Sequence, residues 1–384
     1  MIRNLRTITW SAFLAMFFLG VANSLVGAAA ASIGLAPSQI GFLIAAMNLG
    51  FMVGVMVAGA LADTHDKARI LLAGSLILAV AFLAFYVTDS FGVNLVVMFV
   101  VGVGMGAFEG VTDALLLDIH KARQNYYINV NHFFVTFGSI IIAVYFLFLT
   151  LNWRLALEAS AAIVLLLAVV FALTRLPHVE HHPEPYLNRL RILARDRIVL
   201  TLFVSAVLVV GVEAGTVGIM TSFLSGMRGL AAFQAQWGLV LFLVGVGVGR
   251  LLVGYFSRDE QVATLLIMLF GFSTVIYAAL YFVNLGPLVY GLIFLAGLGM
   301  SALIPLMLTL AGLPYPDMAG TVLGAIKVAF PVGGIILPFL MSVLAARVSF
   351  GASIALFPLA FLFGFLLLWT TLRGVRVAAP EPAA

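Results

Sequence analysis

The chain has 384 residues, of which 64% are hydrophobic and only 9% are charged. Soluble proteins carry about 25% charged residues, so the composition indicates an integral membrane protein. The net charge of +4 rests on few charged residues and does not indicate a nucleic-acid partner. The absence of cysteine excludes disulfides, thiolate metal sites and a cysteine nucleophile.

Apolar segments of about 20 residues, the length that spans a bilayer, recur along the whole chain. The N-terminal sequence MIRNLRTITW continues into the first of them without a small-residue cleavage site, which predicts a retained first helix. We therefore expect an all-α membrane protein with twelve spanning helices in two groups of six. The predicted spans are 9–31, 38–61, 68–87, 91–119, 126–149 and 154–173, then 198–222, 233–256, 261–283, 287–311, 318–345 and 350–372.

A polar, arginine-rich linker separates the two groups of helices. It divides the chain into an N-terminal bundle (1–174), a cytoplasmic linker (175–197), a C-terminal bundle (198–376) and a disordered tail (377–384). Lys and Arg concentrate in the segments on one side, which places both termini in the cytoplasm of a multi-pass inner-membrane protein. His178, His181 and His182 of the linker form a candidate metal cluster, but no acid or Cys pattern fixes a geometry, so a solvated loop is preferred.

Two acids stand out in the fourth predicted helix. Glu109 and Asp113 are four residues apart and therefore share one helix face. An acid at mid-bilayer costs about 2.5 to 3.5 kcal/mol, so this face is expected to look into a polar cavity or at a partner. Burial can bring Glu109 to titrate near neutral pH and couple protonation to a conformational change. The alternatives are a permanent ion pair or a hydrogen bond to the fifth helix.

Asp113 is expected to lie beside Asn131 and His132, because they are at similar distances from the turn between the fourth and fifth helices. This group can bind solute hydroxyls or relay a proton. A structural polar contact between two neighbouring helices is the other interpretation, and the sequence favours neither.

Three more charged residues fall inside predicted helices. Glu213 lies near the middle of the seventh helix and is a candidate for the pathway or for a structural pair with a cation. Lys327 lies about ten residues into the eleventh helix, where an ammonium needs an acid partner, an anionic solute group or a long reach to the cytoplasm. Arg250 is expected to pair with Asp113 or Asp118 at an inner gate, or to extend to the membrane surface.

A loop motif identifies a superfamily. Residues 59–69, GALADTHDKAR, resemble the G-x-x-x-D-x-x-x-[RK]-x-[RK] loop of the major facilitator superfamily. The resemblance implies the major facilitator fold, with Asp63 and Arg69 in a cytoplasmic gate that is held by charge and helix-dipole contacts. His65 and Asp66 depart from the motif, and the second half keeps GRLL at 249–252, Gly254 and Arg258 at the equivalent place.

Four further stretches resemble the fucose permease family and its sodium/glucose transporter-like relatives. They are GMGAFEGVTDALLLD with INVNHFFVTFGS, the GVE at 211–213, the GRLL at 249–252 and the GLGMSALIP at 297–305, where Ala302 replaces a proline. By this resemblance Glu109 matches a carboxylate that takes part in sugar and proton handling, and His132 stands where Gln is frequent. The family often places an acid in the first helix shortly after an Asn, whereas Asn23 is followed by SLVG.

These observations predict a secondary active transporter of a sugar or sugar-like solute, coupled to H⁺ or Na⁺ and needing no cofactor. A drug or organic-anion transporter of the same superfamily is the alternative, which Lys327 and the missing helix-1 acid favour. A receptor without flux is a further class. No nucleotide loop, H-E-x-x-H or nucleophile motif indicates an enzyme. The expected partners are a small solute and the lipid bilayer, with no nucleic acid, and the expected form is a monomer.

Overall fold

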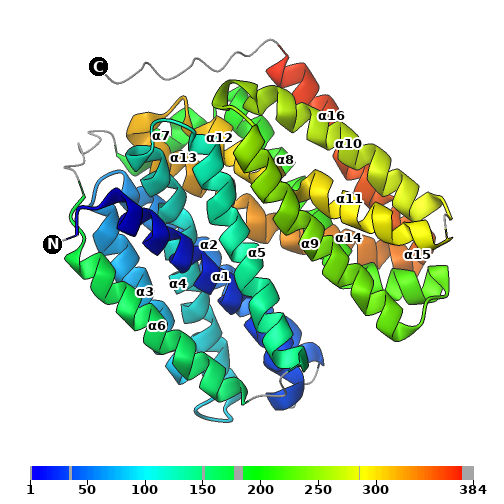
Figure 1. Ribbon diagram of the computed structural model, residues 1–384, viewed down its shortest axis with the longest axis horizontal. Helices are drawn as coiled ribbons and strands as arrows, with labels where there is room; N and C mark the ends of the chain where they lie inside the picture. Colours follow the sequence, from blue (N-terminus) through cyan, green and yellow to red (C-terminus); the bar gives the residue numbers. More distant parts are fainter. Residues whose placement is uncertain (1, 34–36, 149–151, 177–184, 285, 374–384) are drawn as a thin grey trace. The chain divides into compact units, whose positions relative to one another are not determined.

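A computed structural model describes residues 2–33, 37–148, 152–176, 185–284 and 286–373 (Figure 1). The described residues form α-helices, joined by short turns and three 3₁₀ segments. The helices are α1 Leu5–Ile33, α2 Pro37–Ala62, α3 Lys67–Ala84, α4 Phe91–Ile119, α5 Gln124–Phe148, α6 Trp153–Leu173, α7 Tyr186–Leu193, α8 Arg197–Arg228, α9 Ala232–Phe256, α10 Val262–Phe282, α11 Val289–Ser301, α12 Leu303–Gly312, α13 Ala319–Lys327, α14 Ala329–Arg347, α15 Phe350–Ile354 and α16 Leu356–Leu372. The 3₁₀ segments are η1 Asp259–Gln261, η2 Gly286–Leu288 and η3 Pro316–Met318.

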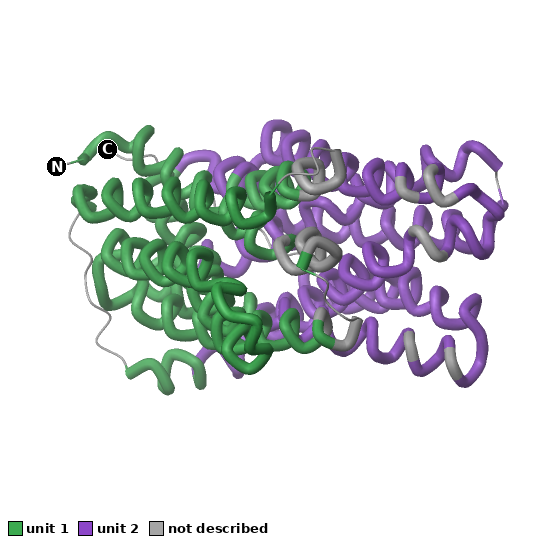
Figure 2. Tube along the Cα trace, turned by 90° about the horizontal axis from the view of Figure 1, so that it is seen from below, with its two compact units in different colours: residues 1–121, 131–191, 315–328 green, residues 122–130, 192–314, 329–384 purple. Residues whose placement is uncertain are grey.

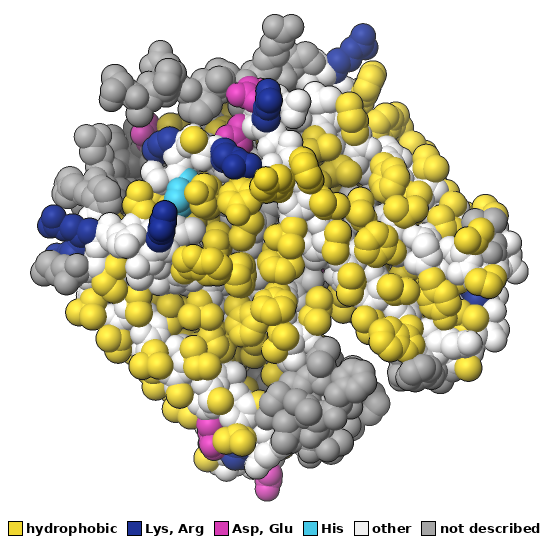
Figure 3. Space-filling view, in the orientation of Figure 1, with side chains coloured by type: hydrophobic (Ala, Val, Ile, Leu, Met, Phe, Trp, Pro, Cys, Tyr) yellow, Lys and Arg dark blue, Asp and Glu magenta, His cyan; other side chains and the backbone are white. Residues whose placement is uncertain are grey.

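Eleven helical segments in the described part of the chain are long and apolar enough to cross a membrane. The remaining predicted span, 126–149, coincides with the 25-residue helix α5. Hydrophobic side chains cover most of the face seen in Figure 3, as the surface of a protein in lipid requires. These features confirm the predicted all-α membrane fold.

Three predicted spans are broken within the membrane-spanning part, and in each case a proline follows the break. The tenth is divided at Ala302 into α11 and α12, the eleventh at Val328 into α13 and α14, and the twelfth at Ala355 into α15 and α16. Proline has no N–H to donate to the carbonyl four residues earlier. Pro305 therefore frees the carbonyl of Ser301, and Pro331 frees that of Lys327. Pro305, Pro331 and Pro338 predict bends in the tenth and eleventh helices. Breaks precede Pro305 and Pro331, whereas α14 continues through Pro338.

The described structure divides into two compact units (Figure 2). Unit 1 contains residues 1–121, 131–191 and 315–328, and unit 2 contains residues 122–130, 192–314 and 329–384. The beginning of α5 therefore belongs to unit 2, while α13 belongs to unit 1. The division into bundles at residues 174 and 198 stays a prediction. The predicted linker contains a helix, α7, which the sequence analysis did not anticipate.

Glycines set the distance between helices inside unit 1. A Cβ built at Gly106 of α4 would lie 2.5 Å from the carbonyl oxygen of Phe51 in α2. A Cβ built at Gly320 of α13 would lie 2.6 Å from the carbonyl oxygen of Gly59, also in α2. Both contacts require glycine, because backbone and side chain cannot occupy the same space. α2 is thereby packed against α4 and α13, the two helices that carry the charged residues described next.

Candidate functional site

Four ionisable side chains meet in the interior of unit 1. Glu109 and Asp113 come from α4, His132 from α5 and Lys327 from the end of α13. Their exposed fractions are 3%, 0%, 4% and 0%, respectively. We call these four residues the charge cluster. Buried ionisable groups in a membrane protein are costly and need partners, and here each group contacts at least one of the others.

Lys327 is the cation at the centre of this network. Its Nζ lies 2.6 Å from Oδ2 of Asp113 and 3.0 Å from Oε1 of Glu109. Nζ also donates a hydrogen bond to the backbone carbonyl of Glu109. The partners of Lys327, which the sequence left open, are thus both acids of α4. The expectation that the ammonium extends to the cytoplasm is not met, because the side chain is completely buried.

Asp113 has the neighbours that its distance from the α4–α5 turn predicts. The Asn131 amide donates to Oδ1 of Asp113 over 2.7 Å, and it also contacts Oγ1 of Thr112 at 3.0 Å. Nε2 of His132 lies 3.0 Å from Oδ2 of Asp113 and 3.9 Å from Oε1 of Glu109. Asp113 therefore connects the ammonium of Lys327 to the imidazole of His132.

The charge cluster retains unused hydrogen-bonding capacity. Oδ1 of Asn131 is buried and accepts no hydrogen bond from the described residues, whereas Oε1 of Glu109 lies 3.0 Å from the Lys327 ammonium. A buried acceptor without a donor costs about 1 to 3 kcal/mol, so a donor from a solute would be bound favourably at Asn131. Glu109, Asp113 and His132 also offer ligand atoms within 4.8 Å of one another, a spacing that suits a metal ion. The ammonium of Lys327 already lies against two of these three groups.

A second acid of unit 1 caps the helix that carries Lys327. Asp63 follows the end of α2 and accepts hydrogen bonds from the backbone N–H groups of Gly320 (2.7 Å) and Thr321 (2.8 Å) at the start of α13. Arg189 of α7 donates to Oδ2 of Asp63 over 2.6 Å and to Oγ1 of Thr321 over 2.8 Å. Burial raises the pKa of the Asp63 carboxyl, while Thr321, Gly320 and Arg189 act to lower it. We call Asp63, Arg189 and Thr321 the α13 latch.

The basic partner of Asp63 was missed by the sequence analysis. Arg69, which the motif places in the gate, is exposed, whereas Arg189 is 3% exposed and paired. The charged linker around Arg189 resembles a solvated segment, and its three prolines and five arginines gave no signal of a buried residue. Lys67 of the same motif pairs with Asp118 at 2.7 Å.

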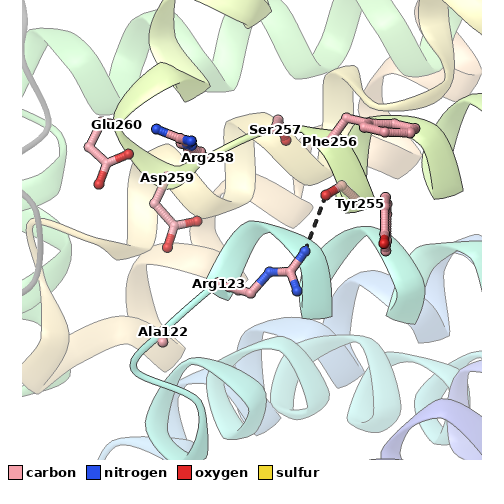
Figure 4. A pocket seen from close by; sticks show the side chains of 8 residues that line it. All are labelled: Ala122, Arg123, Tyr255, Phe256, Ser257, Arg258, Asp259 and Glu260. Carbon is pink, nitrogen blue, oxygen red and sulfur yellow. Dashed lines mark hydrogen bonds between the residues drawn. The ribbon is translucent and has the colours of Figure 1, made fainter.

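Unit 2 contains a similar arrangement, in which an acid caps the start of a helix. The sequence did not indicate this one either. Asp259 of η1 accepts hydrogen bonds from the backbone N–H groups of Gln124 (3.2 Å) and Asn125 (2.9 Å), at the start of α5. Beside it is a pocket of about 470 Å³, which Figure 4 shows with Arg123 reaching the Tyr255 carbonyl at 3.2 Å. The pocket is lined by two arginines and two acids, so its charges are balanced. The lining residues are Ala122, Arg123, Tyr255, Phe256, Ser257, Arg258, Asp259 and Glu260.

The other predicted site residues are on other helices. Asn23 is exposed on α1. Glu213 is half-buried on α8 in unit 2. Arg250 donates from Nε to the carbonyl of Ser301 over 3.0 Å, the carbonyl that Pro305 frees, and its pairing with an acid stays a prediction. The linker histidines at 178, 181 and 182 lie outside the described residues.

Comparisons with known proteins agree with this architecture. A family model described as Major Facilitator Superfamily matches residues 8–229, more than half of the chain. No curated protein sequence matches the chain. Among solved structures, the Escherichia coli fucose:proton symporter FucP is 19% identical, with a TM-score of 0.77 over 95% of this chain and 98% of that one.

Two further structures have the same fold. The human organic anion transporter MFSD10 (TETRAN) is 16% identical, with a TM-score of 0.78 over 94% of this chain and 99% of that one. The proton:xylose symporter XylE, bound to 6-bromo-6-deoxy-D-glucose, is 14% identical, with a TM-score of 0.75 over 97% and 98%. At these identities the likeness establishes the twelve-helix fold of the superfamily.

Proposed function

We propose that this chain moves a sugar or sugar-like solute across the membrane by alternating access. The chain belongs to the major facilitator superfamily, so it is a membrane transporter and not an enzyme. The observation that carries the proposal is the buried charge cluster, in which two acids share one lysine and one histidine. Its helix 4 and helix 5 residues lie in the stretches that resemble the fucose permease family. The similarity to two sugar:proton symporters supports the same substrate class.

Transport is coupled to a cation gradient of H⁺ or Na⁺ through the charge cluster. With a neutral imidazole at His132, two carboxylates against one ammonium leave one excess negative charge in a low-dielectric interior. Binding of one positive charge removes that excess, so occupancy by a cation and the conformation of the protein become linked. Oε1 of Glu109 lies 3.0 Å from the ammonium that Asp113 also contacts, so the two carboxylates share this one cation. Glu109 is thus the coupling group, and Asp113 with His132 and Asn131 forms the polar surface next to it.

The α13 latch forms the cytoplasmic gate, with Asp63 as its central acid. Both chain termini lie on this cytoplasmic side of an inner membrane. An acid at a helix N-terminus interacts favourably with the helix dipole, and here the burial of Arg189 adds a charge partner. Opening requires that Asp63 release the start of α13, which also carries Lys327. The gate and the charge cluster are therefore joined through one short helix of nine residues.

A transporter of organic anions is the second candidate, and Lys327 favours it. An ammonium that is released from its two acids is a receptor for a solute carboxylate or phosphate. The similarity to the organic anion transporter MFSD10 and the absence of an acid after Asn23 point the same way.

Uptake into proteoliposomes distinguishes the two candidates. The purified protein is supplied with labelled neutral hexoses and with sugar acids, under imposed H⁺ or Na⁺ gradients. Accumulation of a neutral hexose driven by one gradient is the expected result. Flux of acidic solutes alone would replace the sugar proposal by the organic-anion function. Binding of solute without any flux would contradict transport itself.

A further inference from the structure

The ammonium of Lys327 sits in a cage of oxygens that resembles a binding site for a small metal cation. Three oxygens from α4 surround it, namely Oδ2 of Asp113, Oε1 of Glu109 and the backbone carbonyl of Glu109. Carboxylate and carbonyl oxygens are the donors that hard cations such as Na⁺, Mg²⁺ and Ca²⁺ select. In secondary transporters, backbone carbonyls near the bilayer midplane serve coupling cations in this way.

We propose that Lys327 is a built-in cation, which occupies the place of an alkali metal ion between Glu109 and Asp113 and so makes the charge cluster independent of Na⁺. This inference rests on the proposed function, and it excludes Na⁺ as the coupling ion of the charge cluster. A lysine ammonium is a compact charge with three donors, which matches the three oxygens around it.

Steric and electrostatic reasons prevent a metal ion from joining the ammonium. Nζ is 2.6 Å from Oδ2 of Asp113 and 3.0 Å from Oε1 of Glu109, so the space between the two carboxylates is filled. A second positive charge at contact distance would be strongly repelled by the ammonium in this low-dielectric interior. Nε2 of His132 lies 3.0 Å from the same Oδ2 of Asp113, so a metal ion at this oxygen would have to displace the ammonium or the imidazole. A gradient that drives transport through the charge cluster is then one of protons.

Two helices, α4 and α13, hold the oxygen cage and the ammonium in place. Glu109 and Asp113 project from one face of α4, and α13 delivers Lys327 at its last residue, where the chain breaks before Pro331. The complete burial of Lys327 removes the competition of water for the ammonium. Removal of the side chain beyond Cβ should therefore leave an anionic cage with room for a free cation.

The test measures cation binding by the purified full-length protein, without any solute. Wild type, Lys327→Ala and Lys327→Arg are compared for ²²Na⁺ binding and for the melting temperature in NaCl against choline chloride at equal ionic strength. Ligand binding to the folded state raises stability with the logarithm of ligand concentration. We expect no Na⁺ effect in wild type or Lys327→Arg, and in Lys327→Ala at least about tenfold more bound ²²Na⁺ with a melting temperature that rises with Na⁺.

Two further measurements keep the outcome unambiguous. The double variant Asp113→Asn, Lys327→Ala should lose the gained Na⁺ response, because a cage ligand is removed. If Lys327→Ala does not yield folded protein in choline, addition of Na⁺ or ammonium ions during purification should restore it. Restoration by neither ion would overturn the proposal.

Sodium binding by wild type that Asp113→Asn abolishes would also overturn the proposal. So would a Lys327→Ala protein that folds but ignores Na⁺. None of these results depends on flux. A failure of the built-in cation is therefore distinct from a failure of the transport function, which the uptake experiment tests.

Discussion

At the scale of single residues, the charge cluster is held together by the one ammonium between two buried carboxylates. Lys327→Met keeps much of the side-chain volume but leaves Glu109 and Asp113 without their cation. Breaking a buried ion pair on one side costs about 3 to 5 kcal/mol, because the remaining charge is buried without compensation. We expect a clear fall in the melting temperature of Lys327→Met, measured on the purified protein.

A charge-matched double variant is the control for this prediction. Asp113→Asn together with Lys327→Met restores the net charge of the wild-type cluster, so it should melt above Lys327→Met alone. If Lys327→Met melts at the wild-type temperature, the ion pairs of Lys327 contribute nothing to the fold and the described network loses its central member.

A pH effect is expected at His120, which follows the end of α4 outside the membrane-spanning segment. Its Nε2 lies 2.7 Å from Oγ1 of Thr9, and burial lowers the pKa of the imidazole. A depressed pKa means that the unfolded chain binds the proton more readily, so stability is full above the ordinary pKa near 6.5 and falls as the pH drops below it. The melting temperature of wild type should therefore fall more than that of His120→Gln on acidification. Parallel curves for the two proteins would contradict this.

Sequence reasoning at the residue scale succeeded where a local rule applies. Asp113, Asn131 and His132 were placed together because one turn joins their two helices and distances can be counted from it. The partners of Lys327 could not be chosen, because the depth and rotation of α13 against α4 depend on contacts between segments about 200 residues apart. Arg189 was missed because a charged residue in a polar linker is normally solvated, and only the docking of α7 buries it.

At the scale of elements, α13 is the helix that connects the latch to the charge cluster. The N–H groups of its first residues donate to the Asp63 carboxylate, its glycines pack on α2, and its last residue is Lys327. A Cβ at Gly320 would lie 2.6 Å from the carbonyl oxygen of Gly59 and 2.7 Å from Oδ1 of Asp63. Gly320→Val should therefore push α13 away from α2 and release the latch.

Cysteine labelling reports this release, since the chain contains no native cysteine. Val55→Cys on α2 is completely buried and should react slowly with a maleimide. Its reaction should become several-fold faster when combined with Gly320→Val. Arg69→Cys, at an exposed position, serves as the control and should react equally fast in both backgrounds. Unchanged protection of Val55→Cys would mean that the glycine contact does not hold α13 in place.

The broken helices show which element features a sequence can reveal. Pro305 and Pro331 predicted bends, and the structure places a break just before each, at Ala302 and Val328. One consequence was not predictable: the freed carbonyl of Ser301 accepts a hydrogen bond from Arg250. That contact requires α9 and α11 to be side by side, which their separate hydrophobic patterns do not specify.

At the scale of the whole molecule, the length of the hydrophobic segments was enough to predict an all-α membrane fold, because a bilayer admits helices of one length range and satisfies no free backbone groups. A prediction of the function also requires the positions of a few polar side chains. The fold is shared with sugar symporters and with an organic anion transporter at 14–19% identity, so architecture alone does not select a solute.

The central claim is that Glu109 couples solute movement to a cation gradient. Glu109→Gln keeps the size of the side chain and removes its charge, so the solute pathway remains while the coupling group is lost. Two activities are compared in proteoliposomes: accumulation against a gradient, and exchange of labelled for unlabelled solute at equilibrium. Glu158→Gln, at an exposed acid of α6, is the matched control and should behave as wild type.

The most direct measurement is the ratio of these two activities in Glu109→Gln. We expect exchange to continue within a few-fold of wild type, whereas accumulation against the gradient disappears. Accumulation by Glu109→Gln at the wild-type level would show that the buried carboxylate is not the group that couples the gradient to the solute.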